Sequence, residues 1–249
     1  MVASNRQTTR RDVGDVVPVR NSKSLNQTVI ENLAVKYVVA VYSMKSHWRE
    51  KNPEAPHLRI RILGKKKFSR IADGMPEPGD LPRKFRGLVK TDLPTECETY
   101  LEAWEAAFEL QKNLKSDNRR ADLPELGPAC RRVYVFEMKP TVINNDTFSE
   151  MNQSLPENYK GTCVYVGETS NCVELRYEQH RSEDHVTSTD WGRDFFRAPF
   201  ELAFREDLVV EFKETGQSIS GLNTYEALKQ ELALRKWLQD EKGIAAYSN

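Results

Sequence analysis

The sequence lacks the long apolar runs that membrane-spanning helices need. None of its apolar stretches approaches the ~20 residues that would cross a bilayer, so no membrane partner is expected. The N-terminal stretch MVASNRQTTRR also lacks the apolar segment of a secretory signal. The expected location is therefore the cytoplasm.

Cysteine and histidine are scarce as well. The cysteines show no C-x-x-C spacing, which argues against a disulfide framework or a cysteine-based zinc site and favours reduced thiols. The chain has four cysteines, at Cys97, Cys130, Cys163 and Cys172, and four histidines, at His47, His57, His180 and His185.

The net charge of the 249 residues is zero, but the charge is unevenly distributed. Residues 1–70 contain 15 Lys and Arg against 5 Asp and Glu, whereas the remainder contains 22 against 32. A basic N-terminal segment ahead of an acidic body predicts a surface for nucleic acid. Residues 1–28 are polar without a sustained period and are expected to form a basic, flexible tail, so a solvated leader is the alternative interpretation.

Two strands are predicted after this tail. Residues 35–44 are rich in Val and Tyr, and residues 56–72 alternate apolar side chains with Arg59 and Arg61. Gly64 and the three lysines after it are expected to form a basic turn into a further strand. The predicted DNA contacts of the chain are Arg59, Arg61, Lys65, Lys66, Lys67 and Arg193.

A helix and a linker complete the first half of the chain. Residues 73–85 hold three prolines and two glycines and are predicted to be a loop, and residues 95–115 have the apolar spacing of a helix. The stretch SDNRRADLPELGP, residues 116–128, is the predicted linker. These elements predict an accessory strand–strand–helix module over 29–116, a candidate for DNA binding, and a second domain over 130–249.

The second domain is predicted to begin with two strands, 131–138 and 161–167, that pair antiparallel around an inserted excursion. Another strand is expected around 208–212, and helices are expected to run to Arg181 and over 225–242. The predicted N-caps of the two helices are Asn171, with Glu174 as its capping-box partner, and Thr224.

The first of these helices carries polar side chains on an apolar face. Val173, Arg176, Tyr177 and His180 are spaced i, i+3, i+4 and i+7, so all four share one face. Val173 and Tyr177 suit a core, whereas Arg176 and His180 suit it only if an anionic group lies nearby. The alternative is an arginine stem that passes apolar neighbours, beside a structural histidine.

The second helix carries an acidic side chain on its apolar face, where the first carries basic ones. Ala227, Leu234 and Leu238 form an apolar stripe, and Glu231 lies within it. A carboxylate in such a stripe costs several kcal/mol if it stays unpaired, so Glu231 should meet a cation. That cation is either Arg176, in a buried salt bridge, or a metal ion.

Two tyrosines, Tyr134 and Tyr165, lie on the predicted strands. Together with the polar residues of the two helices, they suggest phosphodiester hydrolysis. Such a reaction needs a cation on the scissile phosphate, a group that deprotonates water and a metal ion on oxygen ligands. Arg176 offers a bidentate fork for phosphate. A single glutamate with several waters suits Mg²⁺, because this ion gives up its water reluctantly.

These residues resemble the motifs of the GIY-YIG nucleases. In VYVGETSN, Tyr165-Val166-Gly167 stands where the family has its second motif. In VELRYEQH, Arg176 and His180 are similar to the family's arginine and to a histidine four residues later, as in its restriction endonucleases.

The resemblance continues along the last part of the chain. YEALKQELALRKW resembles the glutamate-bearing helix of the family, with Glu231 at its metal-binding position, and Asn249 matches a terminal asparagine. The first motif departs from the pattern, because Arg132-Val133-Tyr134 lacks the glycine and Tyr134 precedes Tyr165 by 31 residues. The resemblance covers about residues 130–249.

The resemblance implies an α/β protein of the α+β type, with a small antiparallel sheet flanked by helices. It implies that a tyrosine, Tyr134 or Tyr165, activates water with His180 as a relay, that Arg176 holds the phosphate and that Glu231 holds Mg²⁺ or Mn²⁺. Asn249 completes the implied catalytic set.

The function implied by the resemblance is a metal-dependent, type II restriction-like endonuclease for double-stranded DNA, with a homodimer left open. Two alternatives stay open, a repair or homing endonuclease and a non-catalytic DNA-binding protein that retains the fold. Glu231 argues against the second alternative, since binding alone requires no metal ligand.

Overall fold

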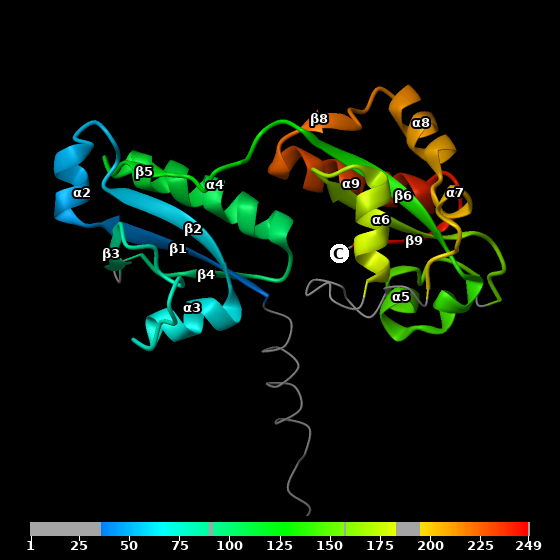
Figure 1. The fold of residues 1–249 in the computed structure, drawn as a ribbon, viewed down its shortest axis with the longest axis horizontal. Helices are drawn as coiled ribbons and strands as arrows, with labels where there is room; N and C mark the ends of the chain where they lie inside the picture. Colours follow the sequence, from blue (N-terminus) through cyan, green and yellow to red (C-terminus); the bar gives the residue numbers. More distant parts are fainter. Residues whose placement is uncertain (1–35, 90–91, 157, 183–194, 249) are drawn as a thin grey trace, which may run out of the picture.

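The chain folds into two lobes, each built around a β-sheet (Figure 1). This computed structural model describes residues 36–89, 92–156, 158–182 and 195–248. Both sheets contain antiparallel and parallel strand pairs and are flanked by helices, which agrees with the expected α+β class. No helix within the described ranges has the length and apolar character of a membrane-spanning segment.

The N-terminal lobe contains a five-stranded sheet in the order β3-β1-β2-β5, with β4 also paired to β1. Its strands are β1 (Tyr37–Met44), β2 (Leu58–Gly64), β3 (Phe85–Leu88), β4 (Thr95–Cys97) and β5 (Ala121–Asp122). Its helices are α2 (Ser46–Lys51), α3 (Lys65–Ala72) and α4 (Tyr100–Ser116). The short strand β5 lies inside the stretch predicted as a linker and pairs in parallel with β2.

Successive side chains of β1 point to opposite faces of this sheet, and both faces are buried. Val39 and Val41 pack with Ala103 and Ala107 of α4, whereas side chains on the opposite face pack with those of α3. A capping box formed by Thr99 and Glu102 starts α4. The observed helix therefore begins later than residue 95, where the sequence predicted its start. The two faces place the basic α3 and the amphipathic α4 on opposite sides of the sheet.

The prediction of a basic turn and strand after Gly64 is wrong, because this segment is the helix α3. Phe68 and Ile71, spaced i and i+3, pack against the second face of the sheet, as helical periodicity requires. Successive residues of a helix point about 100° apart. Lys65, Lys66 and Lys67 therefore do not form one row.

The C-terminal lobe contains a four-stranded sheet in the order β8-β6-β7-β9. Its strands are β6 (Arg131–Met138), β7 (Cys163–Thr169), β8 (Ser220–Leu222) and β9 (Ala245–Tyr247). Its helices are the 3₁₀ helix η1 (Pro140–Asn144), α5 (Asp146–Met151), α6 (Val173–Arg181), α7 (Phe200–Ala203), α8 (Glu206–Glu214) and α9 (Thr224–Asp240).

The strands β6 and β7 pair antiparallel, as predicted. The expectation of a purely antiparallel sheet is wrong, since β9 runs parallel to β7. The cause is α9, which carries the chain back between β8 and β9, so that both strands run in the same direction.

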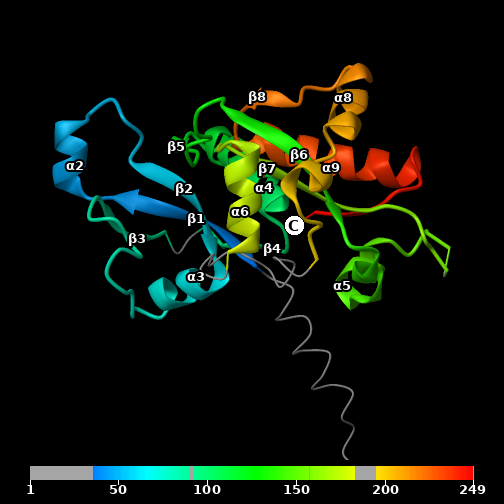
Figure 2. The same cartoon turned by 45° about the vertical axis from the view of Figure 1, so that its right-hand side comes forward.

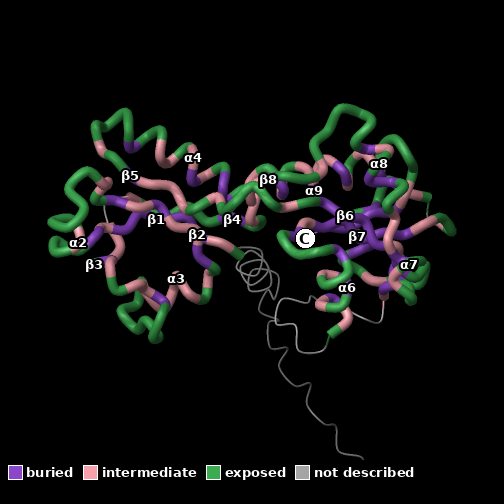
Figure 3. The backbone as a smooth tube through the Cα atoms, turned by 45° about the horizontal axis from the view of Figure 1, so that its top comes forward, coloured by how far each residue is buried: buried purple, intermediate pink, exposed green. Residues whose placement is uncertain are grey.

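Alternation along β6 divides this lobe into two cores. Tyr134 and Phe136 face α5, α6 and α7, whereas Val133 and Val135 face α8 and α9. Figure 3 shows the buried residues concentrated in β6 and β7, and Figure 2 shows α6 and α9 in front of and behind these strands. The two helices with candidate site residues therefore cover opposite faces of one sheet.

The strand predicted around 208–212 is wrong, because this segment lies in α8. Glu206 and Asp207 occupy the first turn, where acidic side chains are favourable, and Leu208 and Phe212 are buried at a spacing of i and i+4. The β-branched pair Val-Val suggested a strand, but burial follows the helical period.

Both predicted N-caps in this lobe are also wrong by one residue. Asn223 rather than Thr224 caps α9, in a capping box with Glu226. Cys172 rather than Asn171 is the N-cap of α6, without a side-chain cap. The Asn171 N–H instead donates to Oγ1 of Thr169, which holds the turn between β7 and α6.

The lobes touch where α4 approaches the start of α9. The rings of Phe108 and Tyr225 pack edge to face with centroids 4.9 Å apart. The Thr224 N–H donates to the carbonyl oxygen of Leu126, 3.0 Å away. The N-terminal lobe thus contacts the first turn of the helix that carries Glu231.

Candidate active site

Three polar side chains meet on the α6 side of the second sheet. The Tyr134 hydroxyl of β6 lies 2.9 Å from Nε2 of His180, and Nε of Arg176 donates to the same hydroxyl oxygen over 3.3 Å. Tyr134 and His180 are buried, whereas Arg176 is partly exposed. The predicted Arg and His of α6 therefore converge on one phenol.

Gly167 makes room for this phenol. In the pairing of β6 with β7, Tyr134 stands opposite Gly167, and a Cβ at residue 167 would lie 2.5 Å from Cζ of the Tyr134 ring. No side chain fits there without displacing Tyr134. A glycine in the third place of Tyr165-Val166-Gly167 is thus required by the position of Tyr134.

Gly167→Ala should destabilise the protein by about 1–3 kcal/mol, the usual cost of overpacking a buried site. Urea unfolding measures the change. Gly87→Ala is the matched control, because Gly87 also lies in a strand and an added Cβ there would meet nothing within 4 Å. Equal stability of the two variants would contradict the packing of Tyr134 on Gly167.

The second tyrosine lies next to the first. The Tyr165 ring of β7 lies 6.2 Å from that of Tyr134 and 5.0 Å from the His180 ring, centroid to centroid. On its other side it stacks with Tyr247 of β9 at 6.0 Å and 28°. Phe196 closes this aromatic layer, 5.3 Å from His180.

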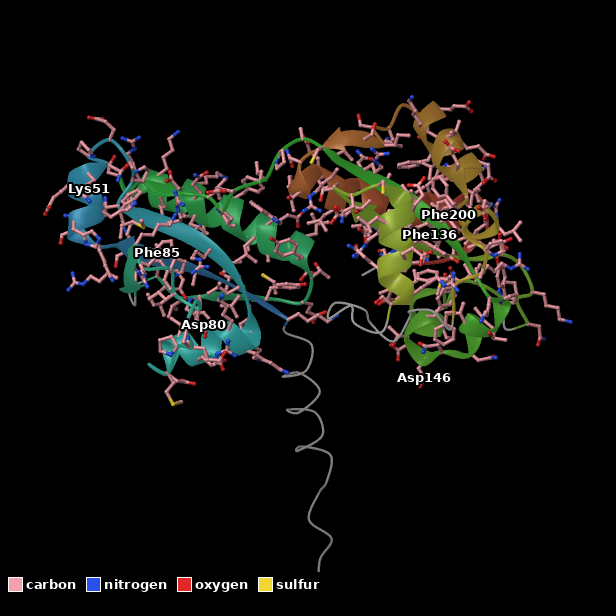
Figure 4. All side chains as sticks on the ribbon, in the orientation of Figure 1. Lys51, Asp80, Phe85, Phe136, Asp146 and Phe200 are labelled. Atoms are coloured by element: carbon pink, nitrogen blue, oxygen red, sulfur yellow. The ribbon has the colours of Figure 1, made fainter. Side chains whose placement is uncertain are left out.

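More aromatic side chains fill the floor of the site. Figure 4 shows Phe136 and Phe200 beside α6, and their ring centroids are 6.2 Å apart. Phe136 also packs edge to face with Tyr177, the residue that follows Arg176. This packing fixes α6 on the sheet and hence the place of Arg176 and His180.

Burial raises the pKa of both tyrosines. For Tyr134 the charge and hydrogen bond of Arg176 oppose the rise, and for Tyr165 the neighbouring Tyr134 adds to it. Burial alone would lower the pKa of Arg176, but its contacts with Tyr134 raise it overall. A charged guanidinium therefore lies against a neutral phenol at pH 7.

The structure places Glu231 in the apolar stripe of α9, as predicted, where it is 6% exposed. Its negative charge raises the pKa of both Tyr134 and Tyr165, although α9 covers the opposite face of the sheet. The carboxylate is therefore close enough to act on the tyrosine pair. Burial lowers the pKa of Arg235, one turn further along α9, and the charge of Glu231 opposes that lowering.

The donor chemistry of this site fits a hard divalent cation such as Mg²⁺ or Mn²⁺ better than a softer metal ion that prefers thiolate or imidazole ligands. Mg²⁺ binds through one or two carboxylates and keeps several waters, and Glu231 is a buried carboxylate whose charge acts on both tyrosines. Across the described ranges, no group of three or more His, Cys, Asp or Glu side chains is arranged to hold a metal ion. A single-glutamate Mg²⁺ or Mn²⁺ site is compatible with both observations.

The long separation between Tyr134 and Tyr165 does not separate them in space. The excursion between β6 and β7 contains η1 and α5, and α5 packs on β9. The strands pair in register from Arg132 with Thr169 to Met138 with Cys163. Inserted structure at the far end of the pair therefore explains the spacing.

Glu168 has a structural partner. Its carboxylate forms an ion pair with Arg131 on the adjacent strand, and both side chains are partly buried. The charges of these two residues also act on Tyr100 of α4. The charge of Glu168 also acts on Tyr134 and Arg176, so Glu168 lies between the N-terminal lobe and the tyrosine site.

Two of the predicted DNA contacts are engaged within the N-terminal lobe. Arg59 pairs with Asp122 at 3.1 Å. The guanidinium of Arg61 lies over the Phe85 ring at 5.2 Å and donates to the Asp80 carbonyl oxygen at 3.4 Å. Figure 4 shows Phe85 and Asp80 in the other lobe from Phe136, so these arginines lie apart from the tyrosine cluster.

The three lysines of α3 differ in their surroundings. Nζ of Lys65 lies 3.9 Å from a Glu96 carboxylate oxygen, and Nζ of Lys67 lies 3.7 Å from one of Asp80. Lys66 is exposed. The pair of Lys65 with the exposed Glu96 is worth about 0–1 kcal/mol. The Asp80 carboxylate beside Lys67, in contrast, is buried and is also held by Arg70.

Three predictions fall outside the described residues. They are the catalytic Asn249, the DNA contact Arg193 and the basic tail 1–28.

Two residues of the site were missed by sequence reasoning. Tyr247 stacks on Tyr165, and Arg235 lies within the electrostatic reach of Glu231. Tyr247 lies in the short segment AAYSN, which has no strand pattern of its own, whereas Arg235 follows Glu231 by four residues and could have been found by helical spacing.

Comparisons with protein-family models, with curated proteins and with solved structures found no match. The geometry around Tyr134 is therefore the basis for assigning a function.

Proposed function

We propose that this protein is a metal-dependent endonuclease of the GIY-YIG type that hydrolyses phosphodiester bonds in double-stranded DNA, as a restriction-like enzyme. The observation that carries the proposal is the convergence of His180 and Arg176 on the Tyr134 hydroxyl. Packing alone does not call for two basic side chains on a buried phenol. Hydrolysis of a phosphate diester uses each of them.

Tyr134 is the tyrosine to which we assign the activation of water, because its hydroxyl contacts both basic groups. Its raised pKa disfavours a standing phenolate. The Tyr134 oxygen would therefore accept a proton from water as its own hydroxyl proton moves to Nε2 of His180. This relay needs a neutral His180 that carries its proton on Nδ1.

Arg176 would hold the scissile phosphate. Its guanidinium is partly exposed, stays charged and is fixed by Tyr134 and by Gln179, whose Oε1 lies 3.4 Å from Nη1. A planar guanidinium matches two phosphate oxygens at once. A phosphate held there would bring its phosphorus close to the Tyr134 hydroxyl, the group proposed to activate the attacking water.

Glu231 would hold the divalent ion, which supplies positive charge for the leaving oxygen when it is bound. Binding DNA requires no metal ligand, whereas hydrolysis assigns a role to the buried Glu231 carboxylate on α9. Glu231 therefore favours an enzyme over a non-catalytic binding protein with the same fold.

The direct test is to incubate the full-length protein with plasmid DNA and Mg²⁺ and to sequence any ends. We expect cleavage that stops when EDTA removes the metal. Ends at one fixed short sequence support a restriction-like enzyme, a long fixed site supports a homing enzyme, and lesion-dependent nicks support repair. DNA binding without any cleavage in Mg²⁺ or Mn²⁺ would contradict the proposal.

The N-terminal lobe would supply contacts to the DNA backbone through α3. Replacing Lys65, Lys66 and Lys67 together by Ala should weaken binding to every duplex. The dependence of log affinity on log salt should flatten by ~0.9 for each phosphate that the variant no longer neutralises. Site preference should stay unchanged, because phosphate contacts carry no sequence information. Binding titrations at several salt concentrations measure both effects.

The matched control replaces three exposed lysines outside α3 by Ala. Lys112, Lys213 and Lys236 are suitable, because each is exposed. Equal salt dependence for the two triple variants would show that α3 does not contact the DNA.

A further inference from the structure

The helix α9 presents a row of three polar side chains towards the β9 edge of the sheet. Glu231, Arg235 and Gln239 are spaced i, i+4 and i+8, so they lie above one another on the helix. Glu231 belongs to the proposed site, and Gln239 has a clear structural role. Arg235, between them, has neither.

Gln239 anchors α9 by hydrogen bonds to neighbouring elements. Its Nε2 lies 2.9 Å from the carbonyl oxygen of Met151, 3.0 Å from Oδ1 of Asn152 and 3.1 Å from the carbonyl oxygen of Ala246. These groups belong to the end of α5 and to β9. The amide thus ties α9 to both elements one turn away from Arg235.

The guanidinium of Arg235 forms few strong hydrogen bonds within the described residues. Its Nη1 lies 3.4 Å from Sδ of Met151, which is a poor acceptor, and its Nε is buried without a hydrogen-bond partner. No carboxylate in the part of the chain that the structure describes lies within 4.0 Å of it. A partly buried arginine with unused donors is costly unless an anion meets it.

The neighbours of Arg235 place it beside the proposed site. The charges of Glu231 and Tyr247 act on it, and the Tyr247 ring stacks on Tyr165. Arg176 acts on the same Tyr165 from α6. The two arginines therefore act on neighbouring tyrosines of one stack, Arg176 on Tyr165 and Arg235 on Tyr247.

We propose that Arg235 binds a second phosphate of the cleaved DNA strand, next to the scissile phosphate on Arg176. This inference rests on the proposed nuclease function and adds a contact that sets the register of the strand. A flanking phosphate meets the unused donors of Arg235. The alternative is an arginine stem that only packs over Met151.

The test uses full-length protein and a duplex that contains a site cut by the wild type. Single phosphates around the cut are replaced in turn by neutral methylphosphonates, and binding is measured in EDTA. At one flanking position the replacement should weaken wild-type binding about tenfold, as expected for a charge-assisted hydrogen bond. Arg235→Met should bind about tenfold more weakly and lose its response to that one replacement.

Lys236→Met is the matched control, because it removes one exposed positive charge from the adjacent position of α9. It should keep the wild-type response at every position. If Arg235→Met folds poorly by circular dichroism, Arg235→Gln replaces it, with the same expected loss. Melting temperatures of all variants are recorded beside the binding data.

The outcomes separate the two proposals. A wild type that cuts no duplex contradicts the nuclease function itself. A wild type that cuts, with Arg235 variants that respond to every methylphosphonate as the wild type does, contradicts the second phosphate contact and leaves the function standing. Loss of the response at one flanking position supports both.

Discussion

Glu231→Gln should abolish DNA cleavage in Mg²⁺ and leave DNA binding within a few fold. The amide keeps the shape of the side chain but lacks the charge that holds a hard cation. Loss of the proposed ion would remove the positive charge available to the leaving oxygen, so the loss should exceed that of any single hydrogen-bond donor. Single-turnover cleavage and binding titrations in EDTA measure the two effects.

Glu241→Gln is the control for this experiment, because Glu241 is an exposed carboxylate at the C-cap of the same helix. It should cleave as the wild type does. A Glu231→Gln variant that cuts at the wild-type rate would show that the buried carboxylate is not the metal ligand. The melting temperature of each variant confirms that the fold is kept.

Arg176→Ala should lower the cleavage rate by about 10²–10³-fold or more, the range seen when one preorganised transition-state donor is removed. The variant loses both the proposed phosphate contact and the hydrogen bond to Tyr134. Rates at saturating protein over duplex isolate the chemical step from binding.

Arg181→Ala tests whether any arginine of α6 would have this effect. Arg181 lies over the Tyr177 ring at 5.4 Å, on the same helix but away from Tyr134. It should lower stability slightly and leave the cleavage rate within a few fold. An Arg176→Ala variant with full activity and a lower melting temperature would assign Arg176 a purely structural role.

The sequence predicted the parts of this site that follow from local periodicity. The strands around Tyr134 and Tyr165 alternate clearly, and the spacing of Arg176 with His180 and of Glu231 with its stripe is helical. Local pattern was enough to place each of these residues on the correct element. Their convergence on the Tyr134 hydroxyl needed the structure, because it depends on the pairing of β6 with β7.

The failures come from tertiary contacts that override local preference. Val209-Val210 has strand propensity, yet α8 forms because Leu208 and Phe212 are buried on one helical face. The parallel β9 is three residues long and depends on α9 for its direction. The role of Gln239 depends on three groups from distant elements, and sequence pattern cannot reveal such a contact.

The contact between Phe108 and Tyr225 bears on how this protein could be re-engineered. A fusion protein that joins only residues 130–249 to another domain would lack Phe108. The ring of Tyr225 in the first turn of α9 would then lose its packing partner. Glu231 lies on the same helix, α9, so a change in its first turn affects the position of Glu231. A transferable fragment should therefore keep α4 together with the N-terminal sheet, because α4 is itself held by Val39 and Val41 of β1.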